Sequence, residues 1–178
     1  MLDMGKIKSV TAKYWGQLIL LLVGFFLDGS LKSVLPLLNR SFFQVSVQIL
    51  LMLLILMVLH NSDHDNQLFW FSLLLGVLYD SYYSRIFGLY TVIFPLTVLC
   101  TRSVRQYVTE SVIFEWSTYF IALTASLIYL YIIGSFLHLT MVNGTHFITD
   151  WLGPTLLVNS LVFIILYWPV TKIIGWLQ

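Results

Sequence analysis

Long apolar runs follow one another along this chain, and the polar segments between them are short. A helix needs roughly 20 apolar residues to cross the hydrocarbon layer of a bilayer. Within that layer, only helices and closed barrels satisfy their own backbone hydrogen bonds. The pattern therefore predicts an all-α, polytopic membrane bundle of about six transmembrane helices. The six runs lie at residues 15–37, 42–59, 68–79, 88–101, 114–137 and 151–168.

The composition leaves no room for a separate soluble domain. Of the 178 residues, 59% are hydrophobic and 10% are charged, and the mean hydropathy is +0.90. We therefore expect a single integral membrane domain over residues 1–178. A net charge of +1, without a basic patch carrying interleaved aromatic residues, predicts no nucleic-acid binding. Cys100 is the sole cysteine, so the chain forms no internal disulfide.

The distribution of basic residues predicts the orientation of the bundle. Six spans place both termini on the same side of the membrane, and the side with more lysine and arginine is normally cytoplasmic. Both termini are therefore expected in the cytoplasm. The terminal side holds Lys6, Lys8, Lys13, Arg102, Arg105 and Lys172, and the other side holds Lys32, Arg40 and Arg85.

The stretch at residues 73–90 interrupts the apolar pattern with a short polar segment. A carboxyl group at the end of a lipid-embedded helix is costly unless it is paired, which makes Asp80 a candidate functional residue. We expect a tight turn in which Arg85 folds back toward Asp80. Two interpretations stay open: a polar hinge between two helices, and an ordinary loop with tyrosines at the headgroup level. The candidate hinge or partner-binding residues are Gly76, Tyr79, Asp80, Tyr82, Tyr83, Arg85 and Gly88, the two glycines allowing close backbone approach.

Two other groups of ionisable residues have a spacing that fits a helix face. Asp28 and Lys32 are four residues apart, so they share a face and can pair. His60 and His64, with Asp63 and Asp65 nearby, have a spacing compatible with a metal ion. Because residues of this kind are also typical of solvated turns, we predict no metal site there.

Signatures of common enzymes are missing from the chain. It contains no zinc-binding His-Glu-x-x-His, no Gly-x-Ser-x-Gly and no phosphate-binding glycine loop. Titratable groups within the apolar runs are too few for a proton relay. We therefore predict a protein that is not an enzyme and that holds no cofactor. A partner-binding scaffold and a substrate-capturing subunit both fit this description.

The sequence LGVLYD at residues 75–80, followed by Tyr82-Tyr83, Gly88-Leu89 and Thr91, resembles the signature of the MreD family. The resemblance extends over the length and hydropathy of nearly the whole chain. It implies a non-enzymatic scaffold of the bacterial cell-elongation complex in the inner membrane. Such a protein binds MreC and helps to control cell shape and peptidoglycan synthesis by a polymerase and a transpeptidase. It also implies a fold related to substrate-binding subunits of energy-coupling-factor transporters.

Within this interpretation, we expect the outward rim around Asp80 to receive the juxtamembrane part of MreC. Faces of small residues are expected to receive its membrane helix. The fifth run carries small residues suited to close helix contact at Ala122, Thr124, Ala125 and Ser126. The alternative is a substrate-binding subunit of a vitamin transporter, which needs a pocket with several convergent polar groups. Trp70, Tyr79, Tyr129, His146 and Asn159 are the residues that would have to meet in it.

Overall fold

The regular structure of the described residues is helical. The computed structural model describes residues 4–38, 45–61, 66–84, 86–107, 111–138 and 142–177, with the side chains of the first range given from residue 13 to residue 33. The predicted all-α class is confirmed for these ranges. The helices are α1 (Met4–Leu38), α2 (Ile49–His60), α3 (Gln67–Tyr79), α4 (Tyr90–Arg105), α5 (Val112–Phe136), α6 (Gly144–His146) and α7 (Gly153–Trp176), with π-helical turns η1 (Asp80–Ser84) and η2 (Phe147–Leu152).

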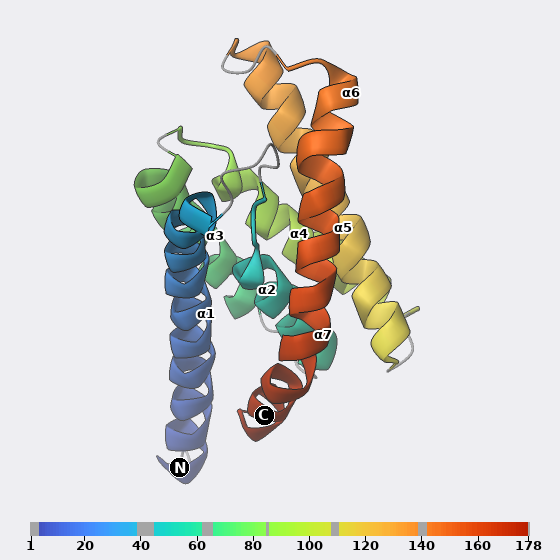
Figure 1. The fold of residues 1–178 in the computed structure, drawn as a ribbon. Coiled ribbons are helices and arrows are strands. Elements are labelled where there is room, and N and C mark those ends of the chain that lie inside the picture. Colours follow the sequence, from blue (N-terminus) through green and yellow to red (C-terminus); the bar gives the residue numbers. More distant parts are fainter. Residues whose placement is uncertain are drawn as a thin grey trace.

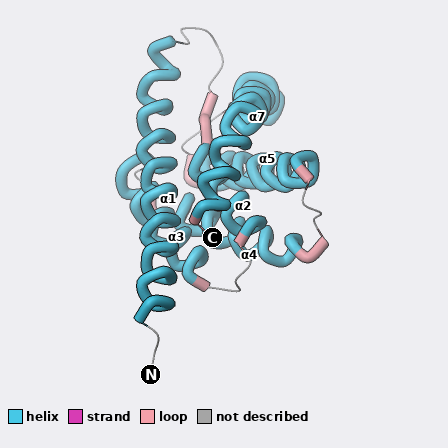
Figure 2. Tube along the Cα trace, turned by 90° about the horizontal axis from the view of Figure 1, so that it is seen from below, coloured by secondary structure: helices cyan, strands magenta, loops and turns pink. Residues whose placement is uncertain are grey.

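Helix α2 occupies the middle of the bundle. Helix α1 stands on one side of it and the neighbouring helices α5 and α7 stand on the other (Figure 1), and the view from below shows the same arrangement (Figure 2). Helix α3 packs extensively along α4. The beginning of α1 and the end of α7 lie at the same end of the bundle (Figure 1).

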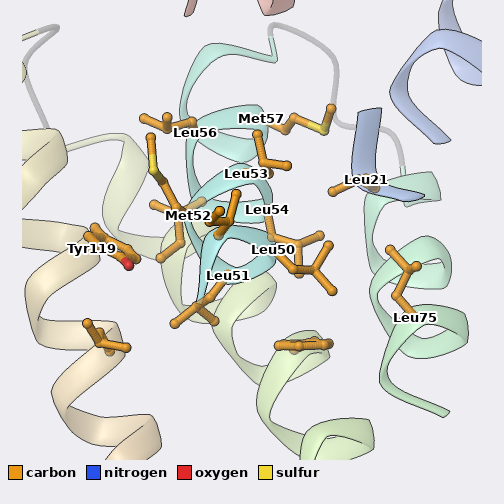
Figure 3. Close-up of a cluster of buried hydrophobic side chains, with 14 of the residues drawn as sticks. Leu21, Leu50, Leu51, Met52, Leu53, Leu54, Leu56, Met57, Leu75 and Tyr119 are labelled. Carbon is orange, nitrogen blue, oxygen red and sulfur yellow. The ribbon is translucent and has the colours of Figure 1, made fainter. Parts of the chain in front are cut away.

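The core is built around α2 because this helix is apolar on every face. Ten consecutive residues of α2, at positions 49–58, are buried. Figure 3 shows their side chains pointing in all directions, with Leu21 of α1, Leu75 of α3 and Tyr119 of α5 around them. Lipid tails are as apolar as leucine, so close packing rather than removal from water stabilises this arrangement.

Three helical segments are long and apolar enough to cross a membrane, at Lys13–Ser33, Val112–Phe136 and Gly144–Trp176. Large apolar side chains on their outer faces are exposed, among them Phe26, Ile121 and Ile165, as expected for contact with lipid. Helices α2, α3 and α4 have 12, 13 and 16 residues. At 1.5 Å per residue they reach about 18–24 Å, which is shorter than the hydrocarbon layer of about 30 Å. Six apolar helices are therefore present where the sequence predicts them, but three do not span by themselves.

The second apolar run differs most from the prediction. A helix was expected from residue 42, yet residues 45–48 are not helical and α2 begins at Ile49. Residues 42–44 lie outside the described ranges. The reason is tertiary: side chains of α5 and α7 bind the backbone of residues 46–48, and a side chain of α1 caps the first residues of α2.

Candidate functional site

The carboxyl group of Asp80 holds the beginning of α4. One oxygen accepts hydrogen bonds from the backbone N–H groups of Gly88 at 2.9 Å and Thr91 at 3.0 Å and from the Thr91 hydroxyl at 2.7 Å. The other accepts from the N–H of Tyr90 at 2.9 Å. The first N–H groups of a helix have no partner within the helix, so Asp80 caps α4 from the end of α3. Its side chain is fully buried.

The described partners of Asp80 are backbone N–H groups and one hydroxyl. The expected approach of Arg85 to Asp80 stays a prediction. Arg85 itself lies outside the described residues. Because Asp80 already accepts four hydrogen bonds and is 0% exposed, it positions the turn and does not form part of the outer surface.

The two glycines of the turn serve different purposes. A Cβ atom at Gly76 would lie 2.7 Å from both the Thr91 Cα and the Tyr90 carbonyl oxygen, so the predicted close approach of backbone is confirmed there. A Cβ at Gly88 would meet nothing within 4 Å, and the close approach expected at this position is wrong. Gly88 has a φ of +103°, a conformation that residues with a side chain rarely adopt.

The three tyrosines of the predicted site lie in two environments. Tyr79 is fully buried, whereas Tyr82 is 72% exposed. Tyr83 is half-buried and donates a hydrogen bond of 3.4 Å to the carbonyl oxygen of Phe25 in α1. Phe87, which the sequence interpretation did not select, is 74% exposed. The turn therefore presents two exposed aromatic side chains, Tyr82 and Phe87.

Lys32 of α1 lies among aromatic rings beside this turn. Its ammonium group is 4.4 Å from the ring centre of Tyr79, 5.2 Å from that of Tyr90 and 5.8 Å from that of Tyr83. Attraction between a cation and an aromatic face is favourable at these distances. The predicted proximity of Lys32 to Asp28 is also present, because their charges lie within electrostatic reach. Lys32 therefore interacts with these aromatic rings and, through its charge, with Asp28.

Asp28 has a second role that the sequence interpretation missed. Its carboxyl oxygens accept hydrogen bonds from the backbone N–H groups of Ile49 at 2.6 Å and Leu50 at 3.2 Å. Asp28 is 1% exposed and caps α2 from α1, as Asp80 caps α4. The acidic side chain compensates the positive end of the helix dipole as well as its unpaired N–H groups. The Tyr79 hydroxyl lies near Asp28 without a hydrogen bond of good geometry.

Asn159 of α7 binds the non-helical segment that precedes α2. Its side-chain oxygen accepts from the N–H of Gln48 at 2.8 Å, and its amide group donates to the carbonyl oxygens of Ser46 at 2.7 Å and Thr155 at 2.8 Å. The Thr155 hydroxyl accepts from the N–H of Ser46 at 3.3 Å, and the Tyr119 hydroxyl donates to the Asn159 oxygen at 3.1 Å. Non-helical backbone at membrane depth requires such partners from surrounding protein.

The side-chain amide of Gln48 contrasts with this saturated network. Gln48 is 1% exposed, and neither its side-chain nitrogen nor its oxygen has a hydrogen-bond partner among the residues that the structure describes. A buried polar group without a partner costs about 1–3 kcal/mol. Hydrogen bonds therefore fix the backbone of Gln48, whereas its side-chain amide lowers the stability of the bundle.

At the other end of α2, His60 lies beside Glu115 in the first turn of α5. The His60 Nε2 atom is 3.7 Å from a Glu115 oxygen, and Glu115 is 3% exposed. Residues 63–65, which complete the weak metal pattern, lie outside the described ranges. Within the described ranges, no three His, Cys, Asp or Glu side chains lie close enough together to hold a metal ion.

The five residues of the transporter alternative do not gather in one pocket. Trp70 is 62% exposed on α3, and His146 is exposed and lies 3.0 Å from Asp150. Tyr79 and Asn159 are fully buried. Tyr129 donates a long hydrogen bond of 3.5 Å to the carbonyl oxygen of Gly88. Exposed and buried members of this set cannot line a shared enclosed site.

These contacts define a class of protein: a helical membrane protein whose buried acidic and amide side chains cap short helices and hold irregular backbone. A family model described as rod shape-determining protein MreD matches residues 13–175, nearly the whole chain. The chain therefore belongs to the MreD family, and its role lies in the determination of rod shape at the inner membrane. No curated protein and no solved structure matches. The expected likeness to subunits of energy-coupling-factor transporters stays a prediction.

Proposed function

We propose that this protein is a non-enzymatic membrane scaffold of the bacterial cell-elongation complex. It binds MreC and thereby helps to control peripheral peptidoglycan synthesis by the polymerase and transpeptidase of that machinery. Membership of the family supports a part in this process. The observation that carries the scaffold role is the use of buried polar groups: Asp28, Asp80 and Asn159 are each engaged with backbone. These buried polar side chains therefore stabilise the bundle by binding its backbone.

The outward rim that we propose for the juxtamembrane part of MreC is the turn between α3 and α4. Asp80 is buried and fixes this turn. The exposed aromatic side chains of Tyr82 and Phe87 therefore make the proposed contact with MreC. Aromatic residues contribute strongly to protein interfaces because they bury a large area with few rotatable bonds. Arg85 is retained as a candidate contact on sequence grounds alone.

Co-purification of the protein with co-expressed MreC in detergent tests this function. We expect the wild type to retain MreC. Tyr82→Ala combined with Phe87→Ala is expected to lower retained MreC by about tenfold or more, the loss typical of an aromatic hot spot, at unchanged abundance. The control is Tyr107→Ala, which removes an aromatic side chain that is 80% exposed beyond the other end of α4.

Asp80→Asn separates positioning from direct contact in the same experiment. In asparagine, an NH2 group replaces one of the two carboxylate oxygens. This group cannot accept hydrogen bonds from the backbone N–H groups that it faces, so we expect the variant to be less abundant and less stable. Loss of MreC at unchanged abundance and unchanged thermal stability would contradict the positioning role of Asp80. Absence of MreC from the wild-type preparation would contradict the proposed function itself.

The transporter alternative has less support, because its five residues do not share a pocket. A tightly retained small molecule in purified protein, together with normal cell shape on depletion, would favour it over scaffolding. Defects in cell shape on depletion would favour the scaffold.

A further inference from the structure

A groove runs along the outer side of the bundle between α4 and α5. Helix α4 packs far more on α3 and α2 than on α5, and the space left between α4 and α5 has a volume of about 280 Å³. The part of α4 that lines it extends from Val92 to Val104, and the part of α5 from Thr118 to Tyr129. At 1.5 Å per residue the groove is about 17 Å long, or three helical turns.

Small side chains make up most of the groove wall on α5, which Ile121 and Tyr129 complete. Thr118, Ala122 and Ser126 lie four residues apart and therefore on one helix face, with Ala125 beside them. Small residues at this spacing allow the backbone of a second membrane helix to approach closely. The hydroxyls of Thr118 and Ser126 are already bonded to carbonyl oxygens of their own helix, at 2.9 and 2.7 Å. The Thr118 and Ser126 hydroxyls are therefore not available to a partner, and this part of the wall behaves as an apolar surface.

The wall on α4 carries two hydroxyl groups that have no partner. Thr97 is 7% exposed and Thr101 is 2% exposed, and both line the groove one helical turn apart. Among the described residues, neither the Thr97 nor the Thr101 hydroxyl makes a hydrogen bond. In lipid, a hydrogen bond to a polar partner stabilises such hydroxyl groups, because hydrocarbon tails cannot form hydrogen bonds. The groove therefore presents two hydrogen-bonding groups to whatever fills it.

We infer that this groove is the binding site for the transmembrane helix of a single-span partner. This rests on the proposed function, in which that partner is MreC. Three turns of groove match one face of a helix, the small residues of α5 allow close packing, and Thr97 and Thr101 bond to a polar or small residue on the incoming helix. A lipid tail would fill the same space but would leave both hydroxyls unpaired.

Disulfide crosslinking from Cys100 tests the inference directly. Cys100 is the only cysteine of the chain, is exposed and lines the groove. Single cysteines are placed in turn along the membrane helix of MreC, and membranes holding both proteins are oxidised. We expect crosslinks that recur every three to four positions, because one face of the MreC helix would lie in the groove. The control is Cys100→Ser with Leu161→Cys, an exposed position on α7 that does not line the groove.

Substitutions within the groove give a second measurement. Ala122→Leu with Ala125→Leu fills the space and is expected to lower retained MreC by about tenfold. Thr97→Val with Thr101→Val keeps the shape but removes both hydroxyls, for which we expect a loss of roughly three- to tenfold. The matched control is Thr124→Val, on α5 outside the groove, whose hydroxyl bonds to the carbonyl of Phe120 at 2.8 Å.

The outcomes separate this inference from the function on which it rests. If MreC co-purifies but crosslinks only to the α7 control, the groove is not its binding site and the proposed function stands. Crosslinks between Cys100 of two copies would assign the groove to a homodimer, and a co-purified lipid displaced only by Ala122→Leu would assign it to lipid. Either result overturns the inference. If the wild type binds no MreC at all, both proposals fail together.

Discussion

At the residue scale, the buried amides of Gln48 and Asn159 make opposite contributions although they lie side by side. Asn159 saturates its amide with four hydrogen bonds involving Ser46, Gln48, Tyr119 and Thr155. The Gln48 side chain has none among the described residues. Because an unmade buried hydrogen bond costs more than a made one contributes, the same chemical group stabilises at one position and destabilises at the other.

We therefore predict that Gln48→Met raises the free energy of unfolding by about 1 kcal/mol or more, since it keeps the volume and removes the unpaired amide. Asn159→Leu is expected to lower it by about 3 kcal/mol, because backbone groups of Ser46 and Gln48 lose their partners. Thermal unfolding in a single detergent measures both. A fall in Tm for Gln48→Met as large as that for Asn159→Leu would mean that the Gln48 amide has a partner in the membrane.

Sequence reasoning identified Asp80 but did not predict the backbone groups that bind it. The cost of burying a carboxyl group is visible in the sequence, because Asp80 ends an apolar run. Its actual partners among the described residues are mostly backbone N–H groups, which every residue except proline carries and which leave no pattern. The role of Asp28 was missed for the same reason, since the N–H groups that it caps lie 21 and 22 residues away.

At the element scale, the turn between α3 and α4 depends on two glycines for two physical reasons. Gly76→Ala places a methyl group against the Thr91 backbone, which cannot move without separating α3 from α4. Gly88→Ala meets no atom but forces a positive φ on a residue with a side chain. The first is an effect of packing between helices, and the second is an effect of backbone conformation alone.

We predict a loss of about 1–3 kcal/mol for Gly76→Ala and of about 1–2 kcal/mol for Gly88→Ala. These losses correspond to a fall in Tm of roughly 2–12 °C and 2–8 °C for a protein of this size. Gly175→Ala is the control, because its Cβ would meet nothing within 4 Å and it lies in α7. There the change is expected to be neutral or slightly stabilising. A Gly76→Ala protein as stable as the control would contradict the close approach of α3 and α4.

The positions of the helices were predictable, and so was the short length of α3, but the late start of α2 was not. Apolar runs reveal helices directly, and each run corresponds to one helix of the described bundle. The shortening of α2 was not visible, because residues 45–48 carry no strong helix-breaking residue. They leave the helix because Asn159, more than 100 positions further along, binds their backbone. Such a distant contact has no local sequence signal.

At the scale of the whole molecule, we predict that the segments before and after α4 face opposite sides of the membrane. Phe87 precedes this helix and Tyr107 follows it, and both are more than 70% exposed. The side that holds Arg102 and Arg105 is the one predicted to be cytoplasmic. Tyr107 should therefore face the cytoplasm, together with both termini, and Phe87 should face outward.

Labelling of single cysteines in spheroplasts tests this orientation. In a Cys100→Ser background, Phe87→Cys is expected to react with a membrane-impermeant maleimide added from outside. Tyr107→Cys is expected to react only after the membrane has been permeabilised, because the bilayer then no longer shields it. The two positions are matched in exposure, at 74% and 80%, so a difference in labelling reports the side of the membrane. The reverse pattern would invert the proposed topology.

The hydrogen bonds between Asn159 and residues 46–48 have a consequence for biogenesis. During synthesis α2 emerges long before α7, so the segment that leads into α2 has no Asn159 to bind while the intervening chain is being made. Non-helical backbone without a partner is strongly disfavoured in lipid. Assembly of the centre of the bundle is therefore completed only when the last helix arrives, and a chain truncated before α7 would be a substrate for membrane quality control.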